Sequence, residues 1–218
     1  MERKSHCVPW PPMENAAQQR TAPEPTPTIP RTIWVVARAR RRPRAGLWEP
    51  TTLPMRALPT DVDMALHVNN GQYFGLFDLG RFDAMVRTGL WDEIRRRGWT
   101  PVVQAEQIAF RRSVTLGQRF DVETRMIGLD ERAVWFEQRV VVDGDVAVRA
   151  YICTRLRKKD GRPVENDEVR AIAAAAGHDL AGEPTLPEWL HEWRRSVALP
   201  SARTPLPHTW DLDTVRRG

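Results

Sequence analysis

The chain has 218 residues, of which 41% are hydrophobic and 28% charged, and its formal net charge is +5. This composition is typical of one sizeable globular domain with tails, and the basic surface favours anionic partners such as a phosphorylated small molecule. The sequence contains neither the aromatic-interleaved basic motifs of an RNA-binding protein nor the spacing of a zinc site, so we expect no nucleic-acid partner and no metal.

The cysteine usage indicates a reducing compartment. Cys7 and Cys153 lie far apart in the sequence, so we expect no disulfide framework and a cytoplasmic location. No apolar run reaches the roughly 18 residues that cross a membrane, and the chain does not begin with the pattern of a signal peptide.

The N-terminal region divides into two segments. Residues 1–30 are rich in Pro, Glu, Thr and Gln, bury too little apolar surface to offset the entropy of ordering, and are expected to be disordered. Residues 31–48 carry a small apolar patch followed by a basic run, Arg38–Arg44. This segment either makes a weak contact with an anionic membrane surface or forms a helix docked on the domain, and the small patch favours the docked helix.

A folded domain is expected over residues 49–158. A strand-like segment runs up to Pro59, and apolar residues then recur at three- and four-residue spacings, which predicts a long buried helix that ends at Gly89. A short helical turn follows at residues 91–98. The period then changes to two, and an Asp-Gly pair marks a hairpin turn at 143–144. The predicted strands are 101–110, 119–128, 133–142 and 146–156.

This order of elements predicts an α+β fold in which one curved antiparallel sheet wraps around a long central helix. Residues 159–218 are expected to form a helical extension and tail. A helix is predicted at residues 162–177, and residues 186–196 are predicted to form an appended turn that packs on the sheet or on a partner subunit.

The polar stretch Thr60–Phe74 stands directly before the long helix. Such a stretch usually only caps the helix, but its spacing here is specific. The residues that carry the spacing are Asp63, His67 four residues later, then Val68, Asn69, Asn70 and Tyr73. This motif, with the strand before it and the helix and four strands after it, resembles that of the hot-dog-fold acyl-CoA thioesterases, in particular the relatives of 4-hydroxybenzoyl-CoA thioesterase.

The resemblance covers about Leu53 to Leu156 and implies a thioester hydrolase that acts on acyl-CoA. It also implies a homodimer or homotetramer with sites at the subunit interface, and no cofactor beyond the coenzyme A of the substrate. One residue departs from the pattern, because many active members have Gly immediately before the His and this chain has Leu66.

Thioester hydrolysis needs a nucleophile at the carbonyl carbon and donors for the developing oxyanion. We expect Asp63 to attack directly or to activate water, with His67 orienting Asp63 or the substrate carbonyl. Free N–H groups of the first helical turn could hold the oxyanion. The Asn70 N–H is the first choice, with Asn69 or Gly71 alongside, while Asn69 could also cap the helix.

Other candidates have a chemical and a purely structural interpretation. Tyr73 could line the acyl pocket or belong to the core. Arg111 and Arg112 could bind the coenzyme A phosphates, or they could be charges that protect a strand edge. Glu106 is a second candidate for the carboxylate, or an outward-facing strand residue. Arg81 is a candidate buried ion-pair partner for Asp78 or Asp83. The alternative function is a hot-dog protein that binds an acyl thioester or lipid without turnover.

Overall fold

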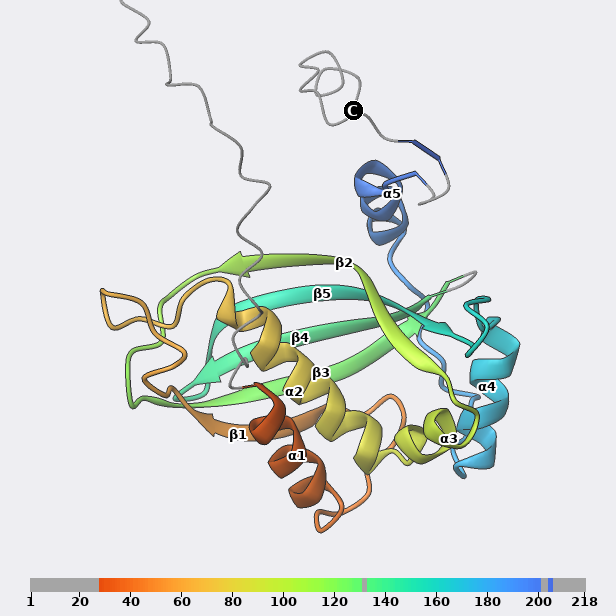
Figure 1. The fold of residues 1–218 in the computed structure, drawn as a ribbon, viewed down its shortest axis with the longest axis horizontal. Helices are drawn as coiled ribbons and strands as arrows, with labels where there is room; N and C mark the ends of the chain where they lie inside the picture. Colours follow the sequence, from red (N-terminus) through yellow and green to blue (C-terminus); the bar gives the residue numbers. More distant parts are fainter. Residues whose placement is uncertain (1–27, 131–132, 201–203, 206–218) are drawn as a thin grey trace, which may run out of the picture.

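The computed structural model describes residues 28–130, 133–200 and 204–205. A five-stranded antiparallel sheet curves around the long helix α2, which confirms the predicted α+β architecture (Figure 1). The elements in chain order are α1 (Thr28–Ala39), β1 (Thr51–Arg56), α2 (Gln72–Arg87), α3 (Leu90–Arg96), β2 (Thr100–Phe110), β3 (Arg119–Leu129), β4 (Val134–Val142), β5 (Asp145–Arg157), α4 (Asn166–Ala175) and α5 (Glu188–Val197).

The strands lie in the order β1-β3-β4-β5-β2, so β2 forms one edge of the sheet. The predicted hairpin turn between β4 and β5 is confirmed, since Asp143 and Gly144 have φ values of 54° and 79°. Positive φ at both central residues is the requirement of the turn that matches the twist of a two-residue hairpin.

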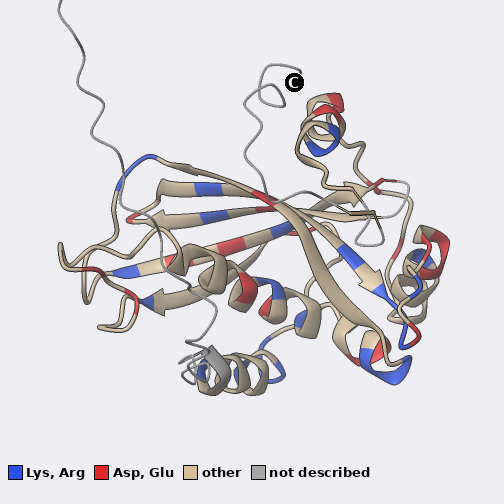
Figure 2. Ribbon diagram, turned by 45° about the horizontal axis from the view of Figure 1, so that its top comes forward, with Lys and Arg blue, Asp and Glu red and all other residues tan. Residues whose placement is uncertain are grey.

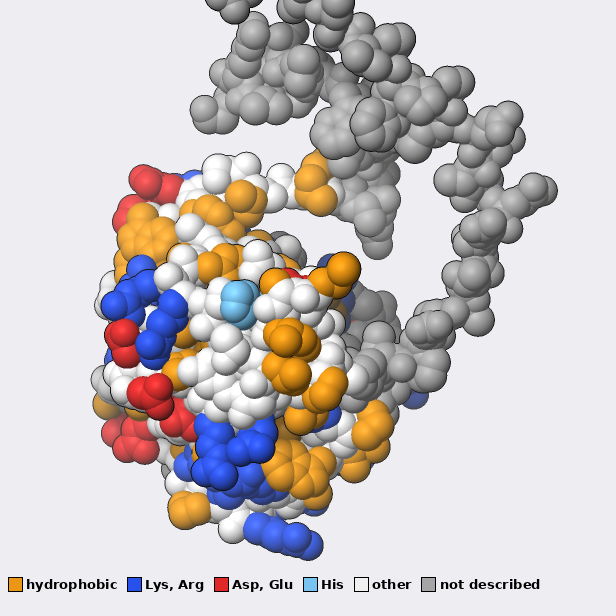
Figure 3. Space-filling view, turned by 90° about the vertical axis from the view of Figure 1, so that its left-hand side faces the viewer, with side chains coloured by type: hydrophobic (Ala, Val, Ile, Leu, Met, Phe, Trp, Pro, Cys, Tyr) orange, Lys and Arg blue, Asp and Glu red, His pale blue; other side chains and the backbone are white. Residues whose placement is uncertain are grey.

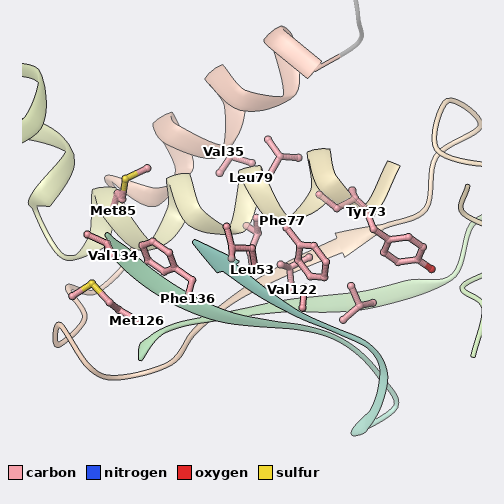
Figure 4. Close-up of a cluster of buried hydrophobic side chains, with 14 of the residues drawn as sticks. Val35, Leu53, Tyr73, Phe77, Leu79, Met85, Val122, Met126, Val134 and Phe136 are labelled. Carbon is pink, nitrogen blue, oxygen red and sulfur yellow. The ribbon is translucent and has the colours of Figure 1, made fainter. Parts of the chain in front are cut away.

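Helix α2 packs its apolar side against the inner face of the sheet, where Phe77 and Val122 meet (Figure 4). The approach is close at Gly80, where a Cβ atom would lie 2.7 Å from both Thr124 Oγ1 and Val122 Cγ1. Only glycine lets the helix backbone come this near to β3.

Helix α1 is docked on the domain through Val35 and Ala39, which are buried. It begins at Thr28, inside the segment expected to be disordered, while residues 1–27, with Cys7, lie outside the described residues. The basic run that follows is largely engaged with the domain. Arg42 Nη1 lies 3.1 Å from Asp83 Oδ1, and Arg44 donates to the carbonyls of Thr88 and Ala176. These contacts favour the docked-helix interpretation over a free membrane-binding face.

Helix α5 covers part of the outer face of the sheet. The sequence predicted that this segment packs on the sheet or on a partner subunit, and the structure shows packing on the sheet. Leu190 is fully buried there, and the rings of Trp135 and Trp193 lie 6.1 Å apart. Asp130 fixes the arrangement, because it accepts a hydrogen bond from Trp135 Nε1 at 2.9 Å and pairs with Arg194 at 2.6 Å.

Among the described residues, no helix has the length and apolar character needed to span a membrane. Cys153, on β5, is free and buried, and burial raises the pKa of its thiol to about 11. A thiol with such a pKa is a poor nucleophile at neutral pH, so Cys153 is a packing residue.

Candidate functional site

Asp63 closes a tight turn in the loop between β1 and α2. Its Oδ1 atom accepts hydrogen bonds from the N–H of Ala65 at 2.9 Å and from the N–H of His67 at 3.4 Å. Its own N–H donates to the His67 carbonyl at 2.9 Å. Among the described residues no donor bonds to Oδ2, and the side chain is exposed, so this oxygen is available for chemistry.

The turn is braced by a second loop, residues 111–118. The backbone of His67 pairs with that of Thr115, and the N–H of Val68 donates to Val114 O at 2.8 Å. The contact between Asp63 and His67 runs through the His67 backbone and not through its ring. Among the described contacts, none joins the His67 imidazole to Asp63, so the predicted orienting role of the ring is not supported. The backbone contacts do define the position of Asp63.

Leu66 stands in the left-handed region, with φ of 57°. A side chain with a Cβ atom costs about 1–2 kcal/mol there, which explains physically why a glycine suits this position. The Leu66 side chain is 57% exposed and lies in the chain between Asp63 and His67. The departure from the family pattern is thus a strained residue beside the candidate site.

Replacing Leu66 with Gly is expected to leave the free energy of unfolding unchanged or to raise it by less than about 1 kcal/mol, because relief of strain slightly exceeds the added entropy of the unfolded chain. Urea unfolding measures the change. The matched control is Ala65→Gly, at ordinary φ, which should only destabilise; equal destabilisation by both variants contradicts the strain argument.

The backbone N–H groups before α2 are mostly committed. The Asn69 N–H donates to Asp61 O at 2.9 Å, and the Gly71 N–H donates to Asn69 Oδ1 at 2.8 Å. The Gln72 N–H reaches Asn69 O. In the described part of the chain no acceptor meets the Asn70 N–H. Of the three predicted amides, Asn69, Asn70 and Gly71, it is therefore the one that remains available. Asn69 closes an Asx turn ahead of the helix.

Tyr73 lies behind this loop, in the core. Its ring is buried and packs edge-on against Phe110 with the centroids 5.5 Å apart. Burial raises the pKa of the Tyr73 phenol, and a hydrogen bond with the Val114 backbone partly offsets the rise. Tyr73 thus ties α2 to β2 and to the bracing loop.

Arg111 and Arg112 both bond to the β4–β5 hairpin. Arg111 Nη1 lies 2.7 Å from Asp145 Oδ2, and Arg112 donates to the Val142 carbonyl. Arg111 also lines a shallow groove of about 410 Å³ together with Arg139 and Arg149. Figure 2 marks Lys and Arg positions in blue along the ribbon of the strands. Sequence reasoning missed Arg139 and Arg149, which become neighbours of Arg111 only through strand pairing.

Glu106 faces α2, and its side chain is only 9% exposed, which corrects its interpretation as an outward-facing residue. Its Oε1 lies 3.1 Å from an Nη atom of Arg81, which also pairs with Asp78 and donates to Gln138 Oε1 at 2.7 Å. Burial raises the pKa of the Glu106 carboxyl, and the Arg81 charge opposes that rise. Asp83 belongs to a different pair, with Arg42.

The candidate site lies in the loops at one end of the sheet. The face that carries them is seen in Figure 3, where groups of exposed apolar side chains lie beside clusters of basic ones. The loops contribute several exposed apolar residues: Leu58, Met64, Leu66 and Leu116. An exposed apolar rim of this kind is typical of a surface that another molecule covers.

Comparison with known proteins gives a consistent picture. Residues 57–193, more than half of the chain, match the thioesterase-like superfamily. Protein THEM6 of Danio rerio is 36% identical over 108 residues, which cover 50% of this chain and 54% of that protein. Protein THEM6 of Drosophila melanogaster is 27% identical over 154 residues, covering 70% and 76%. The chain therefore spans about half the length of the first of these relatives.

Solved structures share the architecture. The DHNA-CoA thioesterase of Staphylococcus aureus superposes with a TM-score of 0.53 at 13% identity, covering 69% of this chain and 97% of that one. The probable thioesterase YbaW of Escherichia coli gives 0.52 at 18% identity, covering 56% and 94%. At these identities the likeness concerns the fold, and it confirms the hot-dog fold.

Proposed function

Because this chain belongs to the thioesterase-like superfamily, we propose that it hydrolyses an acyl-CoA thioester to a free acid and coenzyme A, with Asp63 as the reacting carboxylate. Asp63 Oδ2 either attacks the carbonyl carbon and forms an acyl-aspartyl anhydride that water then hydrolyses, or it takes a proton from a water that attacks. The carbonyl oxygen accepts a hydrogen bond from the Asn70 N–H as its negative charge grows, and the coenzyme A sulfur leaves and is protonated.

One observation carries the proposal. In the loop before α2, Asp63 has Oδ1 hydrogen-bonded and Oδ2 available, and the Asn70 N–H in the same loop meets no acceptor among the described residues. The turn fixes Oδ1 of Asp63 and aims the side chain, which reduces the entropy lost on reaction. The Asn70 N–H stands where the positive end of the α2 dipole favours negative charge.

We also propose that the working unit is a homodimer formed along β2. This edge strand is 11 residues long, and Val102, Val103 and Phe110 are exposed on it. An unpaired apolar edge is a template for a second strand. Pairing there would bring another chain close to the exposed candidate site and complete its walls.

Sedimentation velocity over a range of concentrations is expected to give a dimer. Phe110→Asp places a charge on the edge and is expected to shift the species toward monomer. Leu199→Asp, at an exposed position in the segment after α5, should leave the dimer intact. A wild-type monomer at all concentrations would remove β2 pairing from the proposal.

We place the coenzyme A phosphates in the groove of Arg111, Arg139 and Arg149. Guanidinium groups suit phosphate oxygens because of their planar, bidentate geometry. Each of these arginines already has a carboxylate or ring neighbour: Arg111 meets Asp145, Arg139 meets Glu137, and Arg149 lies over the Tyr151 ring. The groove therefore carries a modest net positive charge.

The test is release of coenzyme A thiol from short, long and aromatic acyl-CoA substrates. Turnover of at least one class by the wild-type protein is the expected result. If none is hydrolysed while acyl-CoA still binds, the protein is a non-catalytic acyl-thioester-binding member of the fold. Strained Leu66 beside Asp63 is the observation that favours this second function.

A further inference from the structure

A cavity of about 340 Å³ lies between α2, α3, α4 and the inner face of the sheet. None of the candidate catalytic residues lines it. Figure 4 shows four of its wall residues, Met85, Met126, Val134 and Phe136, gathered beside the C-terminal half of α2. Its other apolar walls are Phe82, Leu90, Ile94, Pro101, Val103, Leu156, Val169 and Ile172. A pocket of this size and character is suited to an apolar ligand.

The cavity wall also contains a hydroxyl group without a partner. Thr154, on β5, is only 5% exposed, and its Oγ1 atom makes no hydrogen bond in the described structure. Buried hydroxyls nearly always have a partner. A ligand oxygen that hydrogen-bonds to Thr154 Oγ1 would account for this unsatisfied hydroxyl in an otherwise apolar wall.

Charge at the edge of the cavity selects against an anionic ligand. Asp78 and Arg81 line that edge, and Arg81 is already shared between Asp78, Glu106 and Gln138. Two carboxylates therefore stand against one guanidinium. A ligand carboxylate would find no free cation here, whereas a neutral oxygen could pair with Thr154.

The cavity is within reach of the candidate site along α2. The helix begins at Gln72, and Phe82 in the cavity wall is ten residues further on, which corresponds to about 15 Å of helix. An extended dodecyl chain has this reach. Tyr73 with Phe110 and Arg81 with Glu106 close the seam between α2 and β2. Val103 on β2 remains 40% exposed at the cavity rim, so the rim at Val103 is the route of entry.

The far wall is made by α4, which follows the strands. Val169 and Ile172 project from it into the lining. The helix is held in place by the capping box of Glu165 and Glu168 and by the Lys158–Glu168 ion pair at 2.8 Å. The depth of the cavity is therefore set by a segment outside the strands and central helix of the hot-dog core.

We propose that this cavity binds the distal part of the acyl group, and that the preferred acyl group is a medium-length hydrocarbon chain carrying a neutral oxygen that bonds to Thr154 Oγ1. The inference rests on the proposed function for its site of cleavage, at the N-terminus of α2. It adds the substrate class: chain length is limited by α4, and an oxygen substituent is recognised by Thr154.

The test measures binding of alkyl thioethers of coenzyme A, which no thioesterase can cleave. In Val103→Trp, a bulky side chain blocks the rim, and the affinity for the dodecyl thioether relative to the butyl thioether is expected to fall by about tenfold or more, the equivalent of about two buried methylenes. The matched control is Val102→Trp, which is 36% exposed and does not line the cavity. It lies on the same β2 edge as Val103, so any effect on the proposed chain pairing is common to both variants. It should keep the wild-type ratio.

The oxygen is tested with dodecyl thioethers that carry a hydroxyl at successive carbons from the middle of the chain to its end. One isomer is expected to bind the wild type about threefold to tenfold more tightly than plain dodecyl, the worth of one hydrogen bond, and Thr154→Val should abolish that preference. If no isomer is preferred, the role of Thr154 is wrong.

These measurements separate the two proposals. Equal ratios in Val103→Trp and Val102→Trp, or no binding of the dodecyl thioether by wild type, overturn the cavity inference even if acyl-CoA is hydrolysed. Chain-length-dependent binding with no hydrolysis of any thioester supports the cavity and overturns the hydrolase.

Discussion

Asp63→Asn is expected to lower kcat/KM for the best acyl-CoA substrate by about 10³-fold, within the range that acid–base and covalent catalysis contribute. The amide has the size of the carboxylate but can neither attack the carbonyl carbon nor accept a proton. Its oxygen can still accept the N–H bonds of Ala65 and His67, so the turn should persist. The measurement is thiol release at saturating and limiting substrate, with circular dichroism and thermal unfolding as tests of the fold.

Asp63→Ala separates the two roles of this side chain. It removes the charge and also the turn, so it should match Asp63→Asn in lost turnover and exceed it in lost stability. If Asp63→Asn retains wild-type turnover, Asp63 is only a turn residue. Glu106 then becomes the candidate carboxylate, and Glu106→Gln is the variant to assay.

Arg81→Met is expected to lower the free energy of unfolding by about 3–5 kcal/mol, because it leaves a buried carboxylate without its partner. Arg81 and Glu106 have side chains that are only 5% and 9% exposed. Urea unfolding measures the effect. A matched control is Arg111→Met, which breaks an exposed arginine–aspartate pair and should change stability little.

The loss in Arg81→Met should depend on pH. Burial already raises the pKa of Glu106 in the folded protein, and removing the Arg81 charge raises it further. A carboxyl with a raised folded pKa binds protons more tightly in the folded state, so stability falls as pH rises from the unfolded value through the folded pKa. The difference from wild type should therefore be largest near neutral pH and shrink toward about pH 4. Arg81→Met with Glu106→Gln should recover part of the loss; no recovery would show that Glu106 is not the cause.

The sequence predicted the elements well because their signals are local. Apolar periodicity located α2 and the four strands that follow it, and the Asp-Gly pair located the β4–β5 turn. It also indicated Arg81 as an ion-pair partner for Asp78 or Asp83, and the pair with Asp78 is the one that forms. These features depend on residues close together in the chain, or on the burial of one face.

Contacts between residues far apart in the chain were harder to predict from the sequence. The outward-facing interpretation of Glu106 fails because the register shift between Val103 and Ala105 alters the alternation of faces along β2. Thr154 and Gln138 acquire their roles only where β4 and β5 pair beneath α2. The strain at Leu66 could be suspected from a missing glycine, but its positive φ is a property of the folded loop.

Two buried acids, Asp61 and Asp130, pair with the terminal helices α1 and α5 and so set the smallest fragment that can fold. Family similarity spans residues 57–193, yet Asp61 is 5% exposed and its carboxylate pairs with Arg31 of α1, at 2.9 Å. Asp130 is likewise paired with Arg194, one residue beyond that span. A fragment trimmed to the similarity boundaries would also lack β1. The part of the chain that folds autonomously therefore extends at least from α1 through α5. The Arg31–Asp61 and Arg194–Asp130 ion pairs hold these two terminal helices on the domain.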